Sequence, residues 1–140
     1  MRFMTCAAPS YLAAHGTPTH PQELHGHRWL NYFDGSGVVG WDFMKDGERL
    51  ALKFEGGLAL NDSNVYEDAC VAGLGVGQLP AFLVEWHERA GRLVPLLADW
   101  QVESLPVHAV YPSNRHLSTK VQAFVEWVAE VFEGLPAMRR

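Results

Sequence analysis

The chain has 140 residues, of which 48% are hydrophobic and 19% charged, a composition that excludes a disordered segment and predicts one folded domain. Lys and Arg together number 11 against 16 Asp and Glu, which leaves a formal net charge of −5 at pH 7. Because an acidic surface repels phosphate groups, the chain is not expected to bind DNA by itself.

The cysteines and the apolar segments bear on the cellular compartment. Cys6 and Cys70 are far apart, show no Cys-x-x-Cys spacing and lie in apolar stretches, which predicts two buried free thiols. The apolar start of the chain is too short for a signal peptide, and no later stretch reaches the ~20 apolar residues of a membrane span. We therefore expect a cytoplasmic protein that does not associate with membranes.

Strands and short helices are predicted for the first third of the chain. Pro9 cannot donate a hydrogen bond within a sheet and suits the first turn of a helix, and Gly16 can adopt the left-handed conformation that ends one. The predicted elements are a strand over 2–8, a helix over 10–16, a helical turn over 21–24, an aromatic strand over 28–33 and a loop over 34–37.

The middle of the chain is predicted to form a β-hairpin, a further strand and a helix. Asp46 and Gly47 are a pair that supplies the positive φ angles of a tight turn. Asn61, Asp62 and Ser63 are three consecutive candidates for capping a helix N-terminus. The predicted elements are hairpin strands over 41–44 and 50–54, a strand over 58–60 and a helix over 64–72 that ends at Gly73.

The last part of the chain continues the alternation and ends in a long amphipathic helix. The predicted elements are a strand over 74–80, a helix over 81–89, extended runs over 92–97 and 107–111, and a helix over 118–133. Apolar residues recur along one face of the last helix, namely Val121, Phe124, Val125, Val128, Val131 and Phe132. Strands that alternate with helices predict an α/β fold with a mixed sheet, and no internal repeat divides it.

Motifs that carry catalysis or metal binding are absent from the sequence. Gly73, Gly75 and Gly77 resemble part of a dinucleotide-binding fingerprint, but they follow a helix and precede a strand, which is the reverse of the required order. His25 and His27 are the only close histidine pair, and no further ligand stands at metal-binding spacing. We expect no catalytic residue, no metal and no cofactor, and hence a protein that is not an enzyme.

Three stretches carry motifs that occur in the same order and spacing in one protein family. They are Ala8 to His27, with a Pro-x-Tyr-Leu motif followed by Gly-x-Pro; Asn61 to Pro80, with Ala-x-x-Gly-x-Gly ending in Pro; and Gly91 to Trp127. On these motifs the chain resembles the effector-binding domain of LysR-type transcriptional regulators, in particular the CrgA-like branch. One departure is Ala8, which stands where the family usually has Ser.

The resemblance implies a type 2 periplasmic-binding-protein-like fold, in which a small-molecule effector binds between two lobes. The whole of 1–140 would then be a partial effector-binding domain, with lobe II at about 5–100 and the return segment and terminal helix of lobe I at about 105–135. The family's helix-turn-helix and the opening part of lobe I are expected to lie outside this chain. DNA would be bound only through that missing N-terminal domain.

The function that this resemblance predicts is the sensing of a small-molecule effector, of unknown identity, on behalf of a LysR-family transcriptional regulator. The effector site is expected at the carboxyl ends of the strands, where open α/β sheets place their ligands. Its predicted residues are Asn61, Asp62 and Ser63, at a helix N-terminus with free backbone amides, and Gln78, Leu79 and Pro80, at the end of a neighbouring strand. Helix capping alone also explains the residue types at 61–63, and both roles remain open. A stand-alone solute-binding protein of the same fold is the alternative function.

The apolar face of the terminal helix predicts self-association. In the family that the chain resembles, this helix packs on the sheet of lobe I, whose first strands and helices are not in this chain. A fully buried large apolar side chain contributes about 1.5–3 kcal/mol, so a face of this size rarely stays exposed. We expect a homo-oligomer formed through this helix, with a two-fold dimer as its simplest form.

Overall fold

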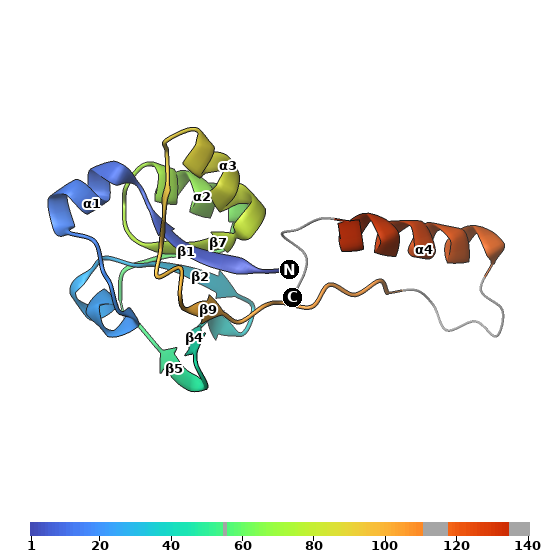
Figure 1. Ribbon diagram of the computed structural model, residues 1–140, viewed down its shortest axis with the longest axis horizontal. Coiled ribbons are helices and arrows are strands. Elements are labelled where there is room, and N and C mark those ends of the chain that lie inside the picture. The colour runs from blue at the N-terminus through green and yellow to red at the C-terminus, as the bar shows by residue number, and fades with distance from the viewer. Residues whose placement is uncertain (55, 111–117, 135–140) are drawn as a thin grey trace.

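The computed structural model describes residues 1–54, 56–110 and 118–134, and Figure 1 shows how its elements are arranged. In chain order the first elements are β1 (Phe3–Ala7), α1 (Pro9–His15), the 3-10 helix η1 (Pro21–Gly26), β2 (Leu30–Asp34), β3 (Gly37–Val38), β4 (Trp41–Lys45), β5 (Glu48–Leu52) and β6 (Leu58–Leu60). The later elements are α2 (Ser63–Val71), β7 (Gly77–Pro80), α3 (Ala81–Arg89), β8 (Val94–Leu96), β9 (Gln101–Val102) and α4 (Thr119–Gly134).

A mixed sheet with strand order β6, β2, β7, β1, β8 forms the centre of the lobe. β1 pairs antiparallel with both β7 and β8, whereas β2 and β6 are parallel. The two halves join where the amide of Leu30 donates to the carbonyl of Val76 at 2.8 Å and the amide of Val76 donates to the carbonyl of Arg28 at 2.8 Å. β1 is therefore antiparallel to all the other strands, and the carboxyl ends of those strands share one edge. The predicted α/β class with a mixed sheet is confirmed.

The strand side chains alternate between two core layers, as the pleat of a strand requires. Cys6 and Ala8 point toward α2 and α3, and Ala7 between them points to the opposite face, which the β4–β5 hairpin and η1 cover. Figure 1 shows α2 and α3 on one side of β1, β2 and β7, and the hairpin on the other. Both faces of the sheet are thus covered, which is typical of α/β folds.

The hairpin forms at the predicted pair of turn residues. Asp46 has φ 50° and Gly47 has φ 85°, which are the positive angles that a two-residue turn needs. β4 pairs antiparallel with β5 on one side and with β9 on the other. β3 and β9 are not predicted from the sequence, because strands of two residues carry no periodic pattern.

Two predicted extended segments differ from the structure. Of the strand expected over 74–80, only Gly77–Pro80 forms a strand, because Gly73 at φ 74° first ends α2 and the chain must then turn. The run expected over 107–111 is described as far as residue 110, and 107–110 belong to no strand. Residue 111 of that run lies outside the described residues.

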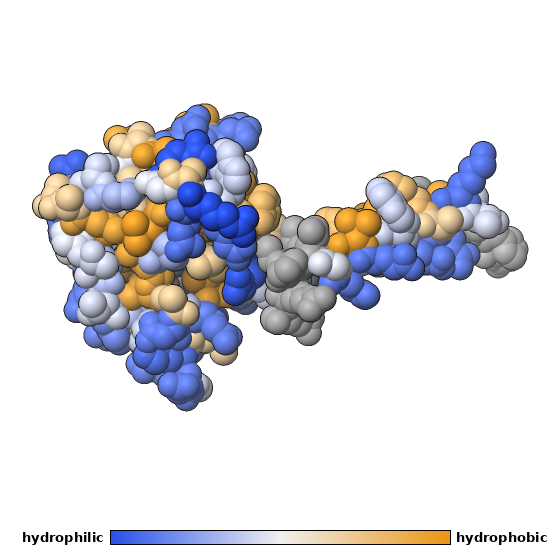
Figure 2. All heavy atoms as spheres, turned by 45° about the horizontal axis from the view of Figure 1, so that its top comes forward, coloured by the Kyte–Doolittle hydropathy of each residue, from blue (hydrophilic) through white to orange (hydrophobic). Residues whose placement is uncertain are grey.

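Helix α4 stands apart from the sheet, as Figure 1 shows, and none of its side chains is buried. Its apolar side chains gather along one side of the helix and hydrophilic ones along the other in Figure 2. Phe124 is 61% exposed and Trp127 is 59% exposed. The helix is confirmed where it was predicted, and its apolar face has no cover among the described residues.

Candidate functional site

The predicted site lies at the edge of the sheet where the carboxyl ends of its parallel strands meet. Asn61 follows β6 directly, and Pro80 is the last residue of β7. The chain also enters and leaves the lobe there, because the terminal ammonium of Met1 donates to the carbonyl of Leu105 at 2.7 Å. This is the edge at which open α/β sheets bind ligands.

Asp62 is the residue that caps helix α2. Its Oδ1 accepts hydrogen bonds from the amides of Asn64 at 2.9 Å and Val65 at 3.1 Å. Two of the amides that a helix N-terminus leaves unpaired are thereby satisfied within the chain. The capping role proposed for the 61–63 segment therefore belongs to Asp62, and Asn61 and Ser63 remain available for other contacts.

Asn61 and Ser63 lie on either side of the Tyr32 hydroxyl group. The Tyr32 hydroxyl donates to the carbonyl of Asn61 at 3.3 Å and lies 3.5 Å from the Ser63 Oγ. Both predicted residues are exposed and Tyr32 is partly exposed, so a solute can reach this group. Tyr32 is not predicted as a site residue from the sequence, because an aromatic residue within a strand has the pattern of a core residue.

The structure separates the other three predicted residues from Asn61, since β2 lies between β6 and β7. The Gln78 side chain donates from its Nε2 to the Oγ1 of Thr5 at 3.5 Å, on the sheet face opposite Leu79. Leu79 is only 3% exposed and packs between the sheet and α2 and α3. Leu79 therefore contributes its side chain to the core, whereas Gln78 and Pro80 are partly exposed.

A buried tyrosine hydroxyl ties β2 to β7 beneath this edge. The Tyr66 hydroxyl donates to the carbonyl of Leu30 at 2.7 Å and accepts from the amide of Gln78 at 3.1 Å. Burial raises the pKa of Tyr66, and the nearby Cys70 raises it further, so the hydroxyl stays neutral and can donate. The hydrogen bond from its amide to Tyr66 on α2 holds the backbone of the predicted site residue Gln78 in place.

Cys6 and Cys70 are adjacent in the core, although they are far apart in sequence. Both are free and buried, which confirms the predicted state of the thiols. A hydrogen bond from Cys70 and burial together raise the pKa of Cys6. A thiol with a raised pKa carries little of the nucleophilic thiolate, so Cys6 is not a reactive site.

A second polar contact joins α2 to α3. The Nε2 of buried His87 lies 2.6 Å from the Oε1 of Glu67. His87 therefore holds two helices together and does not point into solvent. Within 1–54, 56–110 and 118–134, no three His, Cys, Asp or Glu side chains gather as they would around a metal ion.

A hollow that was not predicted from the sequence lies on the face of β2 and β6 that points away from α2. Buried Asn31 forms part of its wall, together with the segment that follows β5. The sequence did carry one relevant feature, an Asn within the apolar run Leu30 to Phe33. A polar residue on a buried strand usually has a specific partner.

The fold and the polar group at the strand ends define a class of protein. A sheet with one antiparallel strand, helices between its parallel strands and exposed polar residues at their carboxyl ends is a lobe of the periplasmic-binding-protein-like fold. The model of the LysR substrate binding domain matches residues 1–133. The chain belongs to this family.

Curated relatives with similar sequences are transcriptional regulators of bacteria. An HTH-type transcriptional repressor of Pseudomonas aeruginosa is 36% identical over 135 residues, which cover 95% of this chain and 43% of the relative. The HTH-type transcriptional regulator CrgA of Neisseria meningitidis is 30% identical over 130 residues, which cover 92% of this chain and 43% of the relative. The chain thus spans less than half the length of these relatives, which are named as regulators and not as enzymes or solute-binding proteins.

Solved structures of LysR-type regulators share the fold. CrgA from Neisseria meningitidis matches with a TM-score of 0.70 and 28% identity, over 93% of this chain and 44% of that one. The regulatory domain of an AphB variant from Vibrio vulnificus matches with a TM-score of 0.72 and 27% identity, over 92% of this chain and 64% of that one. No helix in the described parts of the chain is both long and apolar enough to cross a membrane.

Proposed function

We propose that this chain senses a small-molecule effector for a LysR-family transcriptional regulator that acts in the cytoplasm. The observation that carries the proposal is the exposed polar group of Asn61, Ser63 and Tyr32 at the carboxyl ends of the strands. It lies at the sheet edge where the chain enters and leaves the lobe. The chain segments at Met1 and Leu105 connect the lobe to the rest of the regulator. A ligand bound at this edge can contact both parts, so binding can change the orientation of the lobe relative to the rest of the regulator.

DNA binding belongs to a different part of the regulator in this proposal. The chain has a formal net charge of −5, and it spans 43% of the relatives whose names include a helix-turn-helix. An acidic domain makes no favourable contact with a phosphate backbone. The effector-sensing domain therefore acts on DNA only through the helix-turn-helix domain of the full-length regulator.

Self-association through α4 is the second part of the proposal. Val121, Phe124, Trp127 and Val131 are all exposed on this helix, although they are large and apolar. Exposed apolar surfaces of this kind mark contacts between proteins. A second copy of α4 offers a matching face, and a two-fold arrangement buries both faces at once.

Effector titration of the full-length regulator tests the proposed site. A metabolite panel is screened by thermal shift, since a bound ligand raises the melting temperature by mass action. The variants are Asn61→Ala, Ser63→Ala, Gln78→Ala and Asp62→Asn, the last of which keeps a capping oxygen and removes the charge. Exposed Gln101 on β9 supplies the control Gln101→Ala.

We expect at least one site variant to weaken the response to the effector by about tenfold, which is what a lost hydrogen bond to a charged or buried group costs. The melting temperature without effector should stay within about 2 °C of that of the wild type. An unchanged effector titration in all four site variants would show that the effector binds elsewhere.

A further inference from the structure

The hollow beside β2 is separate from the group of Tyr32, Asn61 and Ser63 at the carboxyl ends of the strands, which we call the strand-end site. It has a volume of about 450 Å³, in the range of pockets that hold small organic ligands. Its walls include Asn31, Val38, Lys53, Phe54 and Ala59, and none of the residues predicted for the effector site. Asn31 and Ala59 are paired across β2 and β6 and alternate with residues that face α2, so the hollow lies on the sheet face opposite that helix.

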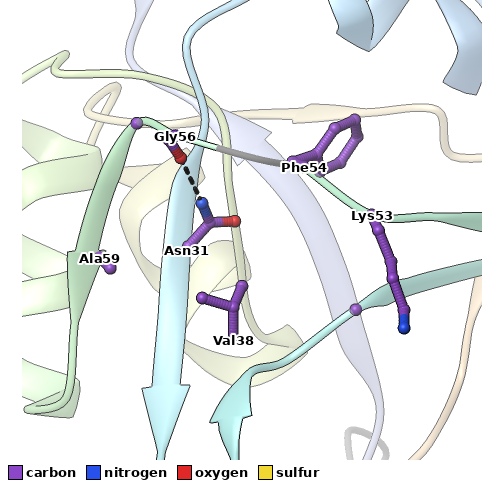
Figure 3. Close-up of a pocket in the computed structure, with 8 residues that line it drawn as sticks. Asn31, Val38, Lys53, Phe54, Gly56 and Ala59 are labelled. Atoms are coloured by element: carbon purple, nitrogen blue, oxygen red, sulfur yellow. Dashed lines mark hydrogen bonds between the residues drawn. The ribbon is translucent and has the colours of Figure 1, made fainter.

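Asn31 brings an unpaired hydrogen-bond acceptor to this hollow. Its side-chain Nδ2 donates to the carbonyl of Gly56 at 2.8 Å, which fixes the orientation of the amide. The Oδ1 on the other side of the amide is buried and has no hydrogen-bond partner among the described residues. Asn31 is only 2% exposed, and Figure 3 shows its oxygen directed toward the space between Val38 and Phe54. A buried carbonyl left in this state is costly, and a donor placed in the hollow removes that cost.

Lys53 supplies a positive charge on the opposite wall. Figure 3 shows its side chain running along the side of the hollow away from Ala59. Its ammonium group forms no ion pair with any side chain in the described parts of the chain, although Lys45, Arg2 and Arg49 each pair with a carboxylate. In a protein with net charge −5, an unpaired ammonium at the mouth of a hollow selects for an anion.

The remaining walls are apolar. Val38 and Phe54 lie between the Asn31 oxygen and the Lys53 side chain, and Ala59 lies on the other side of Asn31, as Figure 3 shows. A solute that reaches both polar groups must therefore have an apolar middle part. This arrangement of few polar groups between apolar walls is typical of ligand sites.

We propose that the hollow binds a small monocarboxylic acid with an apolar middle and a hydroxyl or N–H donor at its far end. The donor bonds to the Asn31 Oδ1, the carboxylate pairs with Lys53, and the middle packs on Val38 and Phe54. The site lies outside the strand-end group that carries the proposed function. A regulator of this kind then has a second input, on the other face of the same sheet.

Titration of the 140-residue chain with three matched probes tests the proposal. 4-Hydroxyphenylacetate has all three features, phenylacetate lacks the donor, and 4-hydroxyphenylacetamide lacks the charge. Two-dimensional NMR should show the first probe shifting the side-chain amide signal of Asn31 and the backbone signals of residues 53–59. We expect phenylacetate to bind about tenfold more weakly, and the acetamide about threefold more weakly because an exposed ion pair contributes little.

Two variants separate the roles of the polar groups. Lys53→Gln should remove the difference between 4-hydroxyphenylacetate and its amide, and Arg49→Gln, which removes another charge from the same hairpin, should leave it intact. Asn31→Leu should remove the difference between 4-hydroxyphenylacetate and phenylacetate. If Asn31→Leu does not fold, a crystal structure of the wild type with 4-hydroxyphenylacetate shows instead whether the hydroxyl group of the probe donates to the Asn31 Oδ1.

Three results would overturn the inference. One is the absence of probe-induced shifts at Asn31 and at 53–59. Another is a crystal at saturating probe in which only a water molecule satisfies the Asn31 oxygen. The third is a set of shifts at Tyr32, Asn61 and Ser63 alone, which would show that the probe uses the strand-end site and would leave the proposed function standing.

Discussion

Helices α2 and α4 both carry apolar residues at helical spacing, but only α2 buries them. Tyr66, Ala69 and Cys70 on α2 pack against the sheet, whereas no side chain of α4 is buried. α4 is the longer and the more apolar of the two, so the difference does not come from the helices themselves. A helical pattern of apolar residues thus predicts which face of a helix becomes buried. It does not predict which surface that face packs against.

The contacts of α2 are also more specific than burial alone requires. Tyr66 bonds to two strands, Asp62 caps the first turn, and Glu67 reaches His87 on α3. Helix α4 has its own local contact, between the Nε2 of Gln122 and the Oε1 of Glu126 at 3.0 Å. A contact of this kind supports one helix and fixes no neighbour.

Among substitutions in the lobe and in α4, the largest effect is expected for one that changes the apolar face of α4. If its apolar face pairs with a second copy, the six predicted face residues together contribute on the order of 10 kcal/mol. Phe124→Glu should convert the dimer of the 140-residue chain to a monomer, as measured by size exclusion with light scattering. Gln122→Glu adds the same charge two residues away, on the other side of the helix. It replaces the contact with Glu126 by a like-charge pair that costs about 0.2–0.5 kcal/mol, and should still leave the dimer intact. A monomeric wild-type chain at high concentration would contradict the prediction.

A matched pair of phenylalanines tests the stability of the lobe against that of α4. Phe43 is 0% exposed at the centre of the hairpin layer, and its replacement by Ala should lower the free energy of unfolding by about 3–5 kcal/mol. Phe124→Ala should change it by less than about 0.5 kcal/mol in dilute, monomeric samples. Urea unfolding followed by tryptophan fluorescence measures both. Equal losses would mean that α4 packs on the lobe.

Removal of one buried hydroxyl tests the tie between β2 and β7. Tyr66→Phe leaves the carbonyl of Leu30 and the amide of Gln78 without a partner, and should cost about 1–3 kcal/mol. Tyr32→Phe removes a hydroxyl that is near the surface and should cost less than about 0.5 kcal/mol. Chemical denaturation of the two variants gives the comparison. A cost for Tyr66→Phe no greater than that for Tyr32→Phe would show that the buried hydroxyl is dispensable.

The N-terminus of α2 allows a smaller test of which residue is the cap. Asp62→Ala should lower the free energy of unfolding by about 0.5–2 kcal/mol, because two amides lose their acceptor. Ser63→Ala should cost only a few tenths of a kcal/mol, since Ser63 is already within the helix. Thermal unfolding of both variants decides between them. The reverse order of stability would assign the cap to Ser63.

The smallest expected effect is a pH dependence that arises at His27. Burial lowers the pKa of His27, and the charge of nearby His15 lowers it further. The unfolded chain therefore takes up this proton at a higher pH than the folded one, so stability is present above about pH 6.5 and is lost as the pH falls through the folded pKa. His27→Gln should flatten the stability curve between about pH 5 and pH 7, whereas His108→Gln at an exposed position should not. Parallel curves for wild type and His27→Gln would exclude this residue as the cause.

Local patterns predicted most of the elements because their causes are local. Gly16 at φ 83°, Gly91 at φ 67° and the turn at Asp46 and Gly47 end or connect elements where the residue types require it. The pairing of β9 with β4 was not predictable, since it joins two short segments that are far apart in the sequence. Residues 107–110 read as a strand but belong to none in the described structure, because a strand needs a neighbour as well as apolar residues.

The candidate site residues also differ in whether local sequence or long-range contacts determine them. Asn61, Asp62 and Ser63 follow a predicted strand and precede a predicted helix, so their place at the sheet edge could be expected from sequence. Leu79 was expected there too, but alternation along β7 turns its side chain into the core. Asn31 could not be found in this way, because its free oxygen depends on the carbonyl of Gly56, 25 residues away in sequence.

The contact between the ammonium of Met1 and the carbonyl of Leu105 has a topological consequence. Two backbone positions separated by 104 residues lie within one hydrogen bond of each other, so the lobe is a nearly closed ring of chain. A linker of a few residues can join them, and new ends can be opened in the exposed loop at Gly35 and Ser36 without breaking a core contact. The two points at which the chain crosses the surface of the lobe therefore lie together, which is the arrangement that insertion of a domain into a host protein requires.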